Sequence, residues 1–165
     1  MLFVGINPGL YSAATGHHFA RPGNRFWPAL HRSGFTNRQL HPSEQVELLK
    51  AGYGITNLVN RGTATADELA PAEFVAGRKR LAAKVRRYRP KTLAFLGVGA
   101  YCHAFLVKEA RIGPQGKNFE GAEVWVLPNP SGLNANYQLP DLVKLFRSLR
   151  DSSREQAWPP SSTSR

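Results

Sequence analysis

Short apolar runs alternate along the chain with longer segments in which apolar residues recur every three or four positions. The apolar runs lie at 2–6, 54–59, 92–96 and 123–127. The segments with helical spacing are 24–34, 42–51, 71–89, 100–108 and 139–149, and loops are expected over 10–24 and 60–70. Runs that are apolar on both sides predict strands of a mainly parallel sheet, and their alternation with helices predicts an α/β fold.

The helix predicted over 71–89 has the clearest division into two faces. Its apolar stripe consists of Phe74, Val75, Leu81, Val85 and Tyr88. The other face carries the cations Arg78, Lys79, Arg80, Lys84, Arg86, Arg87 and Arg89, with Glu73 to balance them. Such a face is usually a solvated surface, but a charge excess of this size also favours attraction to a nucleic-acid backbone.

Length and composition predict one domain with a short tail. A chain of 165 residues fits a single core, because domains usually span about 100–200 residues. We expect this domain to occupy residues 1–150. Residues 151–165 are rich in Ser, Pro and Arg, which predicts a flexible tail.

The net charge sets the chain apart from an ordinary globular domain, because 22 Lys and Arg residues against 11 acids give +11 at pH 7. This excess favours binding to a polyanion, first a nucleic acid and second an anionic membrane surface. The alternative is that the charge serves solubility alone. No run reaches the roughly 18 apolar residues of a membrane helix. No basic region precedes the first apolar run, as it would in a signal peptide. We expect a cytoplasmic protein, associated with the nucleoid when on DNA, and no membrane partner.

The chain offers little that could hold a metal or a cofactor. Its single cysteine, Cys102, excludes an internal disulfide, a cysteine-based zinc site and an iron–sulfur cluster. The five histidines lack a metal-binding spacing such as HExxH, and a phosphate loop of the GxxxxGK[ST] type is absent. We therefore expect no metal, no cofactor and no nucleotide-binding function.

Two Asn-Pro dipeptides follow apolar runs, at 7–8 and 129–130. Proline ends a strand because it has no N–H for the ladder. Since ligands of parallel sheets bind outside the carboxyl ends of the strands, we expect both turns at one functional edge. The carboxamide of Asn7 can orient a water molecule but is no strong base. The alternative is a plain turn that ends the strand.

Two apolar side chains in polar loops are further candidates. Phe19 lies among small and polar residues and either stacks on a flat base or anchors its loop in the core. Leu133 follows Ser131 and Gly132 and either acts as a wedge in a base stack or belongs to the core.

Three motifs occur in order across the chain: GINPGL at 5–10, GxxFAxPxNRFW at 16–27 and NPSGL at 129–133. Together they resemble the mismatch-specific uracil-DNA glycosylases, relatives of the thymine-DNA glycosylases, from Leu2 to about Arg150. The resemblance implies a three-layer α/β/α fold with a central four-stranded sheet. It also implies a monofunctional DNA glycosylase that flips uracil, especially opposite guanine, out of double-stranded DNA and hydrolyses its N-glycosidic bond without a cofactor.

The resemblance gives roles to four residues around the flipped base. Asn7 would orient the attacking water, and Phe19 would stack on the base. Backbone groups of Ile6 and Phe19 would read the uracil edge, and Ser12 would line the pocket.

The resemblance assigns the turn of Asn129, Ser131, Gly132 and Leu133 to the DNA. Gly132 and Leu133 would fill the space of the flipped nucleotide and touch the widowed guanine. Relatives commonly carry an arginine two residues after this leucine, where the present chain has Ala135. The missing guanidinium predicts weaker contacts with the opposite strand, and hence activity on several mismatches and on single strands.

The middle loop also departs from the family pattern. Some relatives carry a lysine at the position of Asn57, and this chain has a carboxylate at Asp67, where relatives vary. Because Asn7 cannot deprotonate water, a nearby carboxylate would do so or would stabilise the oxocarbenium-like sugar. We therefore name Asp67 as a second candidate catalytic residue. Otherwise it caps the helix that begins near Pro71 or lies in solvent.

The alternative function is a non-catalytic module that binds damaged DNA on the same fold. Such a protein would keep Phe19 and Leu133 but would not need Asn7, which is present. The enzyme reading is therefore favoured, with a monomer acting on uracil-containing duplex DNA.

Overall fold

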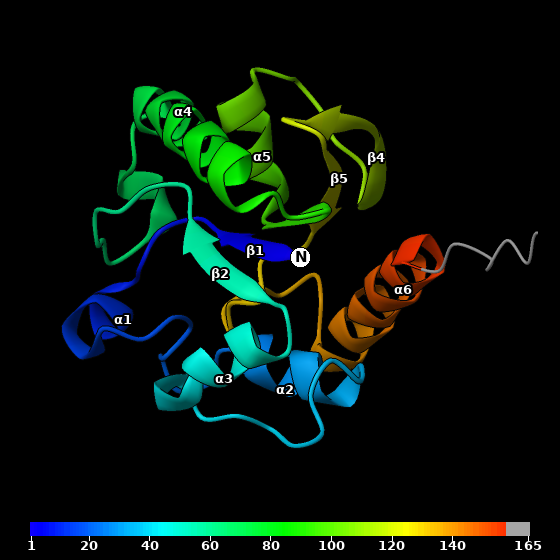
Figure 1. Ribbon diagram of the computed structural model, residues 1–165. Coiled ribbons are helices and arrows are strands. Elements are labelled where there is room, and N and C mark those ends of the chain that lie inside the picture. The colour runs from blue at the N-terminus through cyan, green and yellow to red at the C-terminus, as the bar shows by residue number, and fades with distance from the viewer. Residues whose placement is uncertain (158–165) are drawn as a thin grey trace, which may run out of the picture.

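The computed structural model describes residues 1–157. They form three layers, and the middle layer is a five-stranded sheet (Figure 1). The strand order is β2-β1-β3-β5-β4, with β1 at Leu2–Gly5, β2 at Gly54–Asn57, β3 at Thr92–Leu96, β4 at Gly113–Phe119 and β5 at Ala122–Leu127. Strands β2, β1, β3 and β5 run parallel to one another, and β4 is antiparallel to β5. The predicted three-layer fold with a mainly parallel sheet is confirmed.

The apolar pattern predicts four strands and misses β4. The sequence of β4, GPQGKNF, holds two glycines, a proline and polar residues, so it has no apolar run. Its register against β5 shifts between Pro114 and Asn118, and proline, which has no N–H to donate, is tolerated at such an edge. β4 lies at the edge of the sheet, where pairing on one side does not require a buried side-chain face.

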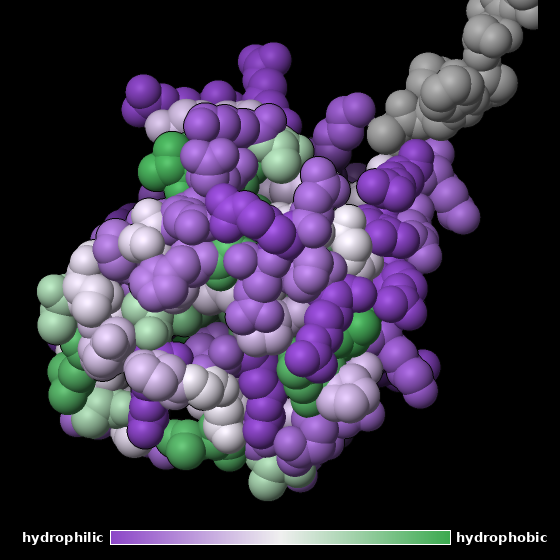
Figure 2. Space-filling model, turned by 90° about the horizontal axis from the view of Figure 1, so that it is seen from below, coloured by the Kyte–Doolittle hydropathy of each residue, from purple (hydrophilic) through white to green (hydrophobic). Residues whose placement is uncertain are grey.

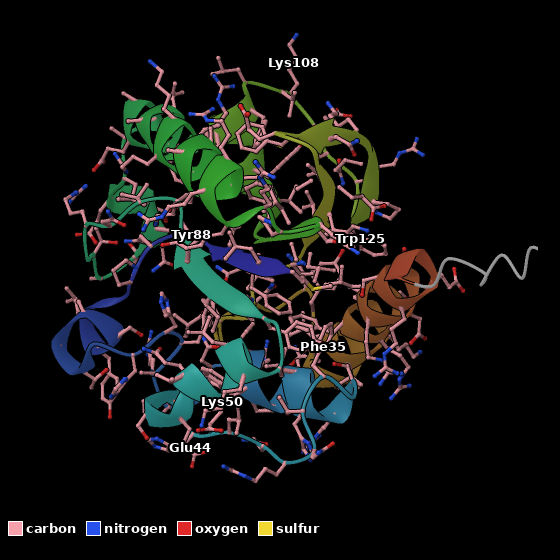
Figure 3. All side chains as sticks on the ribbon, viewed as in Figure 1. Phe35, Glu44, Lys50, Tyr88, Lys108 and Trp125 are labelled. Atoms are coloured by element: carbon pink, nitrogen blue, oxygen red, sulfur yellow. The ribbon has the colours of Figure 1, made fainter. Side chains whose placement is uncertain are left out.

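Helices cover both faces of the sheet. α4 (Pro71–Tyr88) and α5 (Val98–Phe105) cover one face, and α2 (Phe26–Arg32), α3 (Val46–Lys50) and α6 (Leu139–Ala157) cover the other (Figure 1). Successive strand residues alternate between the two cores: Phe3 packs with α2 and α6, and Val4 packs with α4 and α5. Phe35 and Trp125 are buried, whereas Lys108 projects into solvent (Figure 3). Burial on both faces explains why the strands are continuously apolar.

Two helical segments differ from the sequence prediction. α1 (Leu10–Thr15) occupies part of the expected loop and ends at Gly16, whose φ of 75° is left-handed and suits glycine. The expected helix over 42–51 is a 3₁₀ turn, η1 (Pro42–Glu44), followed by α3.

The assignment of residues 151–165 to a flexible tail is wrong for 151–157, because α6 continues to Ala157. Arg, Glu, Gln and Ala in this segment are good helix formers, and most of the Ser and Pro of the tail come later. Residues 158–165 of the predicted tail lie outside the described residues.

The two Asn-Pro turns leave the same edge of the sheet, as predicted. β1 and β5 flank β3 and run parallel to it, so Asn7 and Asn129 both follow carboxyl ends of strands. β2 ends on that edge as well, where Asn57 pairs with Gly5. This edge therefore brings together the turns that the sequence selected.

The surface is mostly polar. In the face seen in Figure 2, hydrophilic residues predominate and hydrophobic residues form small separate groups. Among the described helices, none has the length and apolar character needed to cross a bilayer.

Candidate active site

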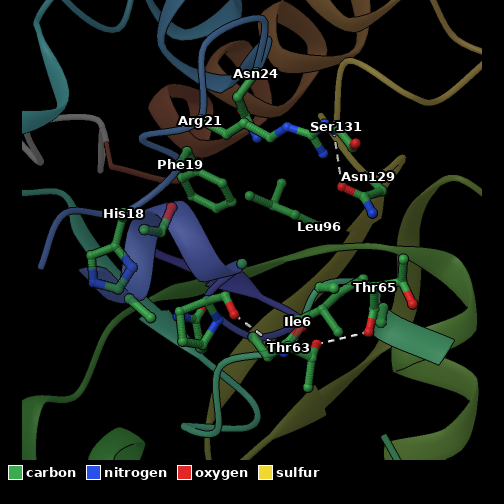
Figure 4. A pocket seen from close by; sticks show the side chains of 18 of the residues that line it. Ile6, His18, Phe19, Arg21, Asn24, Thr63, Thr65, Leu96, Asn129 and Ser131 are labelled. Carbon is green, nitrogen blue, oxygen red and sulfur yellow. Dashed lines mark hydrogen bonds between the residues drawn. The ribbon is translucent and has the colours of Figure 1, made fainter. Parts of the chain in front are cut away.

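A pocket of about 440 Å³ opens at this edge of the sheet (Figure 4). Its size lies within the roughly 300–1,000 Å³ of small-molecule sites. Seven of the residues selected from the sequence line it: Ile6, Asn7, Ser12, Phe19, Asn129, Ser131 and Leu133. Asp67 and Gly132, which the sequence also selected, are not among its lining residues.

The carboxamide of Asn7 is held by three acceptors. Its Nδ2 donates to Thr63 Oγ1 at 2.7 Å, to the Arg61 carbonyl at 2.9 Å and to the Pro8 carbonyl at 3.3 Å. Thr63 Oγ1 donates its own hydrogen to the Thr65 carbonyl at 2.7 Å, so it accepts from Asn7. Because carbonyl oxygens do not donate, these partners determine which end of the carboxamide is the nitrogen. Oδ1 of Asn7 takes part in no hydrogen bond among the described residues and remains an acceptor for a ligand.

An ion pair supports the loop that presents these acceptors. Arg61 donates to both carboxylate oxygens of Glu73, at 2.9 and 3.1 Å, and to the Glu68 carbonyl at 3.0 Å. The Arg61 guanidinium, with the Ala70 N–H, lowers the pKa of Glu73 to about 2. Glu73 belongs to the first turn of α4, so this helix anchors the segment that holds Asn7.

The ring of Phe19 forms a second wall of the pocket, away from Thr63 (Figure 4). It is half-buried and stacks on Phe26, with ring centroids 4.3 Å apart and an interplanar angle of 30°. Glycine at position 5 permits this placement, because a Cβ on Gly5 would lie 3.2 Å from Phe19 Cζ. Phe19 is thus anchored to the core and also faces the pocket.

The backbone of Phe19 is strained and unpaired. Its φ of 52° is left-handed, which costs a non-glycine residue about 1–2 kcal/mol. The Ala20 N–H donates to Ser12 Oγ at 3.1 Å and so helps to hold this conformation. Among the described residues no hydrogen bond engages the N–H or the carbonyl of Phe19. The Ile6 carbonyl, by contrast, already accepts from the Val59 N–H at 2.9 Å and keeps one lone pair.

The turn after β5 presents Leu133 at the rim of the pocket. Asn129 Oδ1 accepts from the Ser131 N–H at 3.0 Å, and Ser131 Oγ accepts from the Leu133 N–H at 3.2 Å. Leu133 is 71% exposed, so the alternative that it belongs to the core is wrong. A Cβ on Gly132 would lie 2.5 Å from the carbonyl oxygen of Gly23, so glycine is needed where this turn meets the loop before α2.

A protein-family model, described as the uracil DNA glycosylase superfamily, matches residues 1–158. The chain belongs to the uracil DNA glycosylase superfamily. Membership places the protein among the DNA glycosylases, hydrolases of base excision repair whose substrate is DNA.

Sequence reasoning missed several residues that line the glycosylase pocket. They are mostly neutral and polar: Arg21, Asn24, Asn57, Asn60, Thr63 and Thr65. Amide side chains both donate and accept, which suits the edge of a base. A signal existed for Asn57, which ends β2 opposite Gly5 at the sheet edge where Asn7 and Asn129 also lie.

The electrostatic character of the glycosylase pocket is neutral to positive. Burial lowers the pKa of His18, and the charge of Lys84 lowers it further, so this imidazole is neutral near pH 7. His17 Nδ1 is buried without a partner among the described residues, and Arg21 adds a cation at the wall. Within the part of the chain that the structure describes, no carboxylate lines this pocket and no group of three metal-ligating side chains forms.

Asp67 lies beside the glycosylase pocket rather than in it. It is exposed and belongs to the 3₁₀ turn η2 (Ala66–Glu68). It borders a neighbouring hollow of about 460 Å³ that shares Ile6, Ala66 and Asn129 with the first. The alternative that Asp67 caps α4 is wrong, because the N-cap residue is Ala70, whose N–H donates to Glu73 at 2.8 Å, and among the described residues Asp67 makes no hydrogen bond to the backbone of α4. A catalytic role of Asp67 stays a prediction.

Proposed function

We propose that the protein removes uracil from double-stranded DNA, especially uracil mispaired with guanine, as a monofunctional glycosylase. The observation that carries this proposal is the oriented carboxamide of Asn7, which shares a pocket with the ring of Phe19. The carboxamide suits the binding of a water molecule, and the aromatic ring suits stacking on a flat base.

In the proposed reaction, Asn7 Oδ1 accepts a hydrogen bond from a water molecule and directs its oxygen at C1′ of the deoxyribose. The bond between C1′ and N1 of uracil breaks, and its electron pair leaves with the base. The water oxygen bonds to C1′, and its proton passes to solvent or to the departing base. The products are uracil and an abasic site. Orientation is the contribution of Asn7, because a preorganised nucleophile lowers the barrier without proton transfer to the amide.

Phe19 serves the base in two ways in this proposal. Its ring stacks on the extruded uracil, an interaction worth about 1–3 kcal/mol in single-strand binders. Its unpaired N–H and carbonyl are free to pair with the uracil edge, and Ile6, the residue that follows β1, adds its backbone. A donor aimed at a uracil oxygen also stabilises the negative charge that develops on the leaving base.

Leu133 opens the duplex in this proposal. The scissile bond is buried in a base stack, so the nucleotide must be extruded before cleavage. An exposed leucine at the pocket rim can occupy the vacated space. Because a mismatched pair costs less to open, extrusion itself favours uracil opposite guanine.

The net charge supports the attraction to DNA more than the basic face of α4 does. Part of the basic face of α4 is engaged within the protein, since Lys84 donates to Thr56 Oγ1 and Arg86 pairs with Glu120. The overall charge of +11 still favours a polyanion. We further propose that the protein works in the cytoplasm as a monomer, on nucleoid DNA.

The proposed function is tested with labelled duplexes that carry one uracil opposite each of the four bases. Under single-turnover conditions the wild-type protein should release uracil and leave alkali-labile sites, without cutting the strand itself. Binding to uracil duplexes without release of base would favour the non-catalytic module instead. Strand cleavage without alkali would contradict monofunctional activity.

A further inference from the structure

The guanidinium of Arg25 is surrounded by acceptors from one short segment. Residues 129–138, hereafter the wedge loop, supply all of them. Arg25 Nη1 donates to the carbonyls of Ser131 at 3.3 Å, Asn134 at 2.9 Å and Tyr137 at 2.9 Å. Arg25 Nη2 donates to the Gly132 carbonyl at 3.2 Å and to Gln138 Oε1 at 3.1 Å.

The N–H groups of the wedge loop are satisfied differently from its carbonyls. Side chains of the same region accept from the N–H groups of Ser131, Leu133, Asn136 and Gln138. Four of its carbonyls instead converge on the one guanidinium of Arg25. Carbonyl dipoles that point at a common centre repel one another when no donor lies between them, and here the donor between them is the Arg25 guanidinium.

The backbone next to Arg25 joins the same two segments. The Arg25 N–H donates to the Pro130 carbonyl at 2.8 Å. Gly132 packs so closely on Gly23 that a Cβ would lie 2.5 Å from its carbonyl oxygen. Arg25 also precedes Phe26, the residue on which Phe19 stacks. The contacts of Arg25 thus join the stacked rings of Phe19 and Phe26 to the wedge loop.

We infer that Arg25 is a positioning residue that holds the wedge loop in its DNA-ready shape before DNA arrives. This inference rests on the proposed function for its consequence, the entry of Leu133 into the duplex. A preformed loop places the exposed leucine without the entropy cost of ordering it on binding. Arg25 acts through Leu133 and does not touch the reacting atoms.

Lysine is the informative substitution at this position. Arginine presents five N–H donors in a planar fork, whereas a lysine ammonium presents three donors at one point. Arg25→Lys keeps the charge and most of the aliphatic stem. Its single ammonium group cannot donate to all the acceptors that the two Nη atoms of Arg25 contact. Arg32→Lys is the matched control, because Arg32 ends the helix α2 that follows Arg25, is exposed and is outside the pocket.

The first test is a double-mutant cycle on a duplex with uracil opposite guanine. Arg25→Lys and Leu133→Ala should each slow single-turnover cleavage roughly tenfold. The cleavage rate of the double variant should lie within about threefold of the rate of the slower single variant. Arg32→Lys should match wild type. Single effects that multiply to about a hundredfold would overturn the inference, because Arg25 would then act independently of Leu133.

The second test is amide hydrogen exchange of the full chain without DNA. Arg25→Lys should accelerate exchange in the wedge loop by roughly tenfold and leave the sheet unchanged, while Leu133→Ala should not alter it. Gly132→Ala, which pushes the loop from Gly23 with Arg25 intact, should also accelerate exchange. Unchanged exchange in Arg25→Lys would overturn the inference. This readout needs no catalysis, so it remains decisive if the wild-type protein cleaves no uracil and the proposed function fails.

Discussion

Asn7 Nδ2 lies 2.7 Å from Thr63 Oγ1, the shortest of the three hydrogen bonds that orient its carboxamide. The two residues are far apart in the chain and come from the segments that follow β1 and β2. Thr63 is buried, and its hydroxyl hydrogen is committed to the Thr65 carbonyl. The Asn7 Nδ2 group is therefore the donor in the bond that orients the carboxamide. The carboxamide oxygen, Oδ1, is left to accept from water.

The first prediction concerns this support. Thr63→Val removes the acceptor but keeps the shape, so the Asn7 amide loses one of its three restraints. We expect single-turnover cleavage to slow by about two- to tenfold, the effect of one hydrogen bond, with DNA affinity unchanged. Thr36→Val is the control, since its hydroxyl bonds to the Arg38 carbonyl outside the pocket. Equal rates for Thr63→Val and wild type would show that the other two acceptors suffice.

The second prediction concerns the base opposite uracil. Ala135 is exposed and carries no group that could contact a widowed guanine. We expect only a weak preference for uracil opposite guanine, set by the lower cost of opening a mismatch, with clear single-turnover cleavage of U·A duplexes and measurable cleavage of single strands. Ala135→Arg should raise the U·G to U·A rate ratio, whereas Ala83→Arg, an exposed change on α4 with the same added charge, should not. Strict dependence of the wild-type protein on U·G would contradict this prediction.

The third prediction concerns Asp67. Its carboxylate borders the hollow beside the pocket and does not line the pocket that holds Asn7, so we expect it to act on the sugar electrostatically rather than as a general base. We expect Asp67→Asn to slow single-turnover cleavage by roughly tenfold, less than a well-placed general base would contribute. Glu109→Gln, an exposed acid remote from both hollows, serves as control. An unchanged rate for Asp67→Asn would remove Asp67 from the mechanism.

The fourth prediction concerns pH and stability. The pKa of His18 is lowered in the folded protein by burial and by Lys84, relative to its ordinary value of 6.5. Between the two values the unfolded chain binds more protons, so the free energy of unfolding falls as the pH drops below about 6.5. Denaturant unfolding from pH 7.5 to 5 should show this loss, and His18→Gln should reduce it. His103→Gln, at an exposed position, should retain the wild-type slope. The same slope in wild type and His18→Gln would contradict the assignment.

The strands could be predicted because burial on both faces leaves a direct mark in the sequence. Phe3 and Val4 enter different cores, so both must be apolar. β4 left no such mark, since an edge strand is held by backbone pairing. α1 was missed because a helix this short, closed by Gly16, has the composition of a loop.

The site could be predicted in part, because proline and asparagine at the ends of strands locate the edge where parallel strands meet. This reasoning selected Asn7 and Asn129 but not the partners of Asn7. Thr63 and Arg61 meet it through contacts between residues more than fifty positions apart, which no local pattern records. Only the exposed fraction of Leu133 in the structure decides between a wedge and a core residue. The position of Asp67 depends on the 3₁₀ turn that comes after β2, which the sequence pattern does not predict.

The proposed reaction depends most directly on Asn7, and single-turnover cleavage of a U·G duplex by Asn7→Ala tests this dependence. Asn37→Ala, which removes the same side chain at an exposed position outside the pocket, is the matched control. We predict that Asn7→Ala binds the duplex with wild-type affinity but cleaves it at least about a hundredfold more slowly, while Asn37→Ala cleaves at the wild-type rate. Cleavage by Asn7→Ala at the wild-type rate would contradict the account.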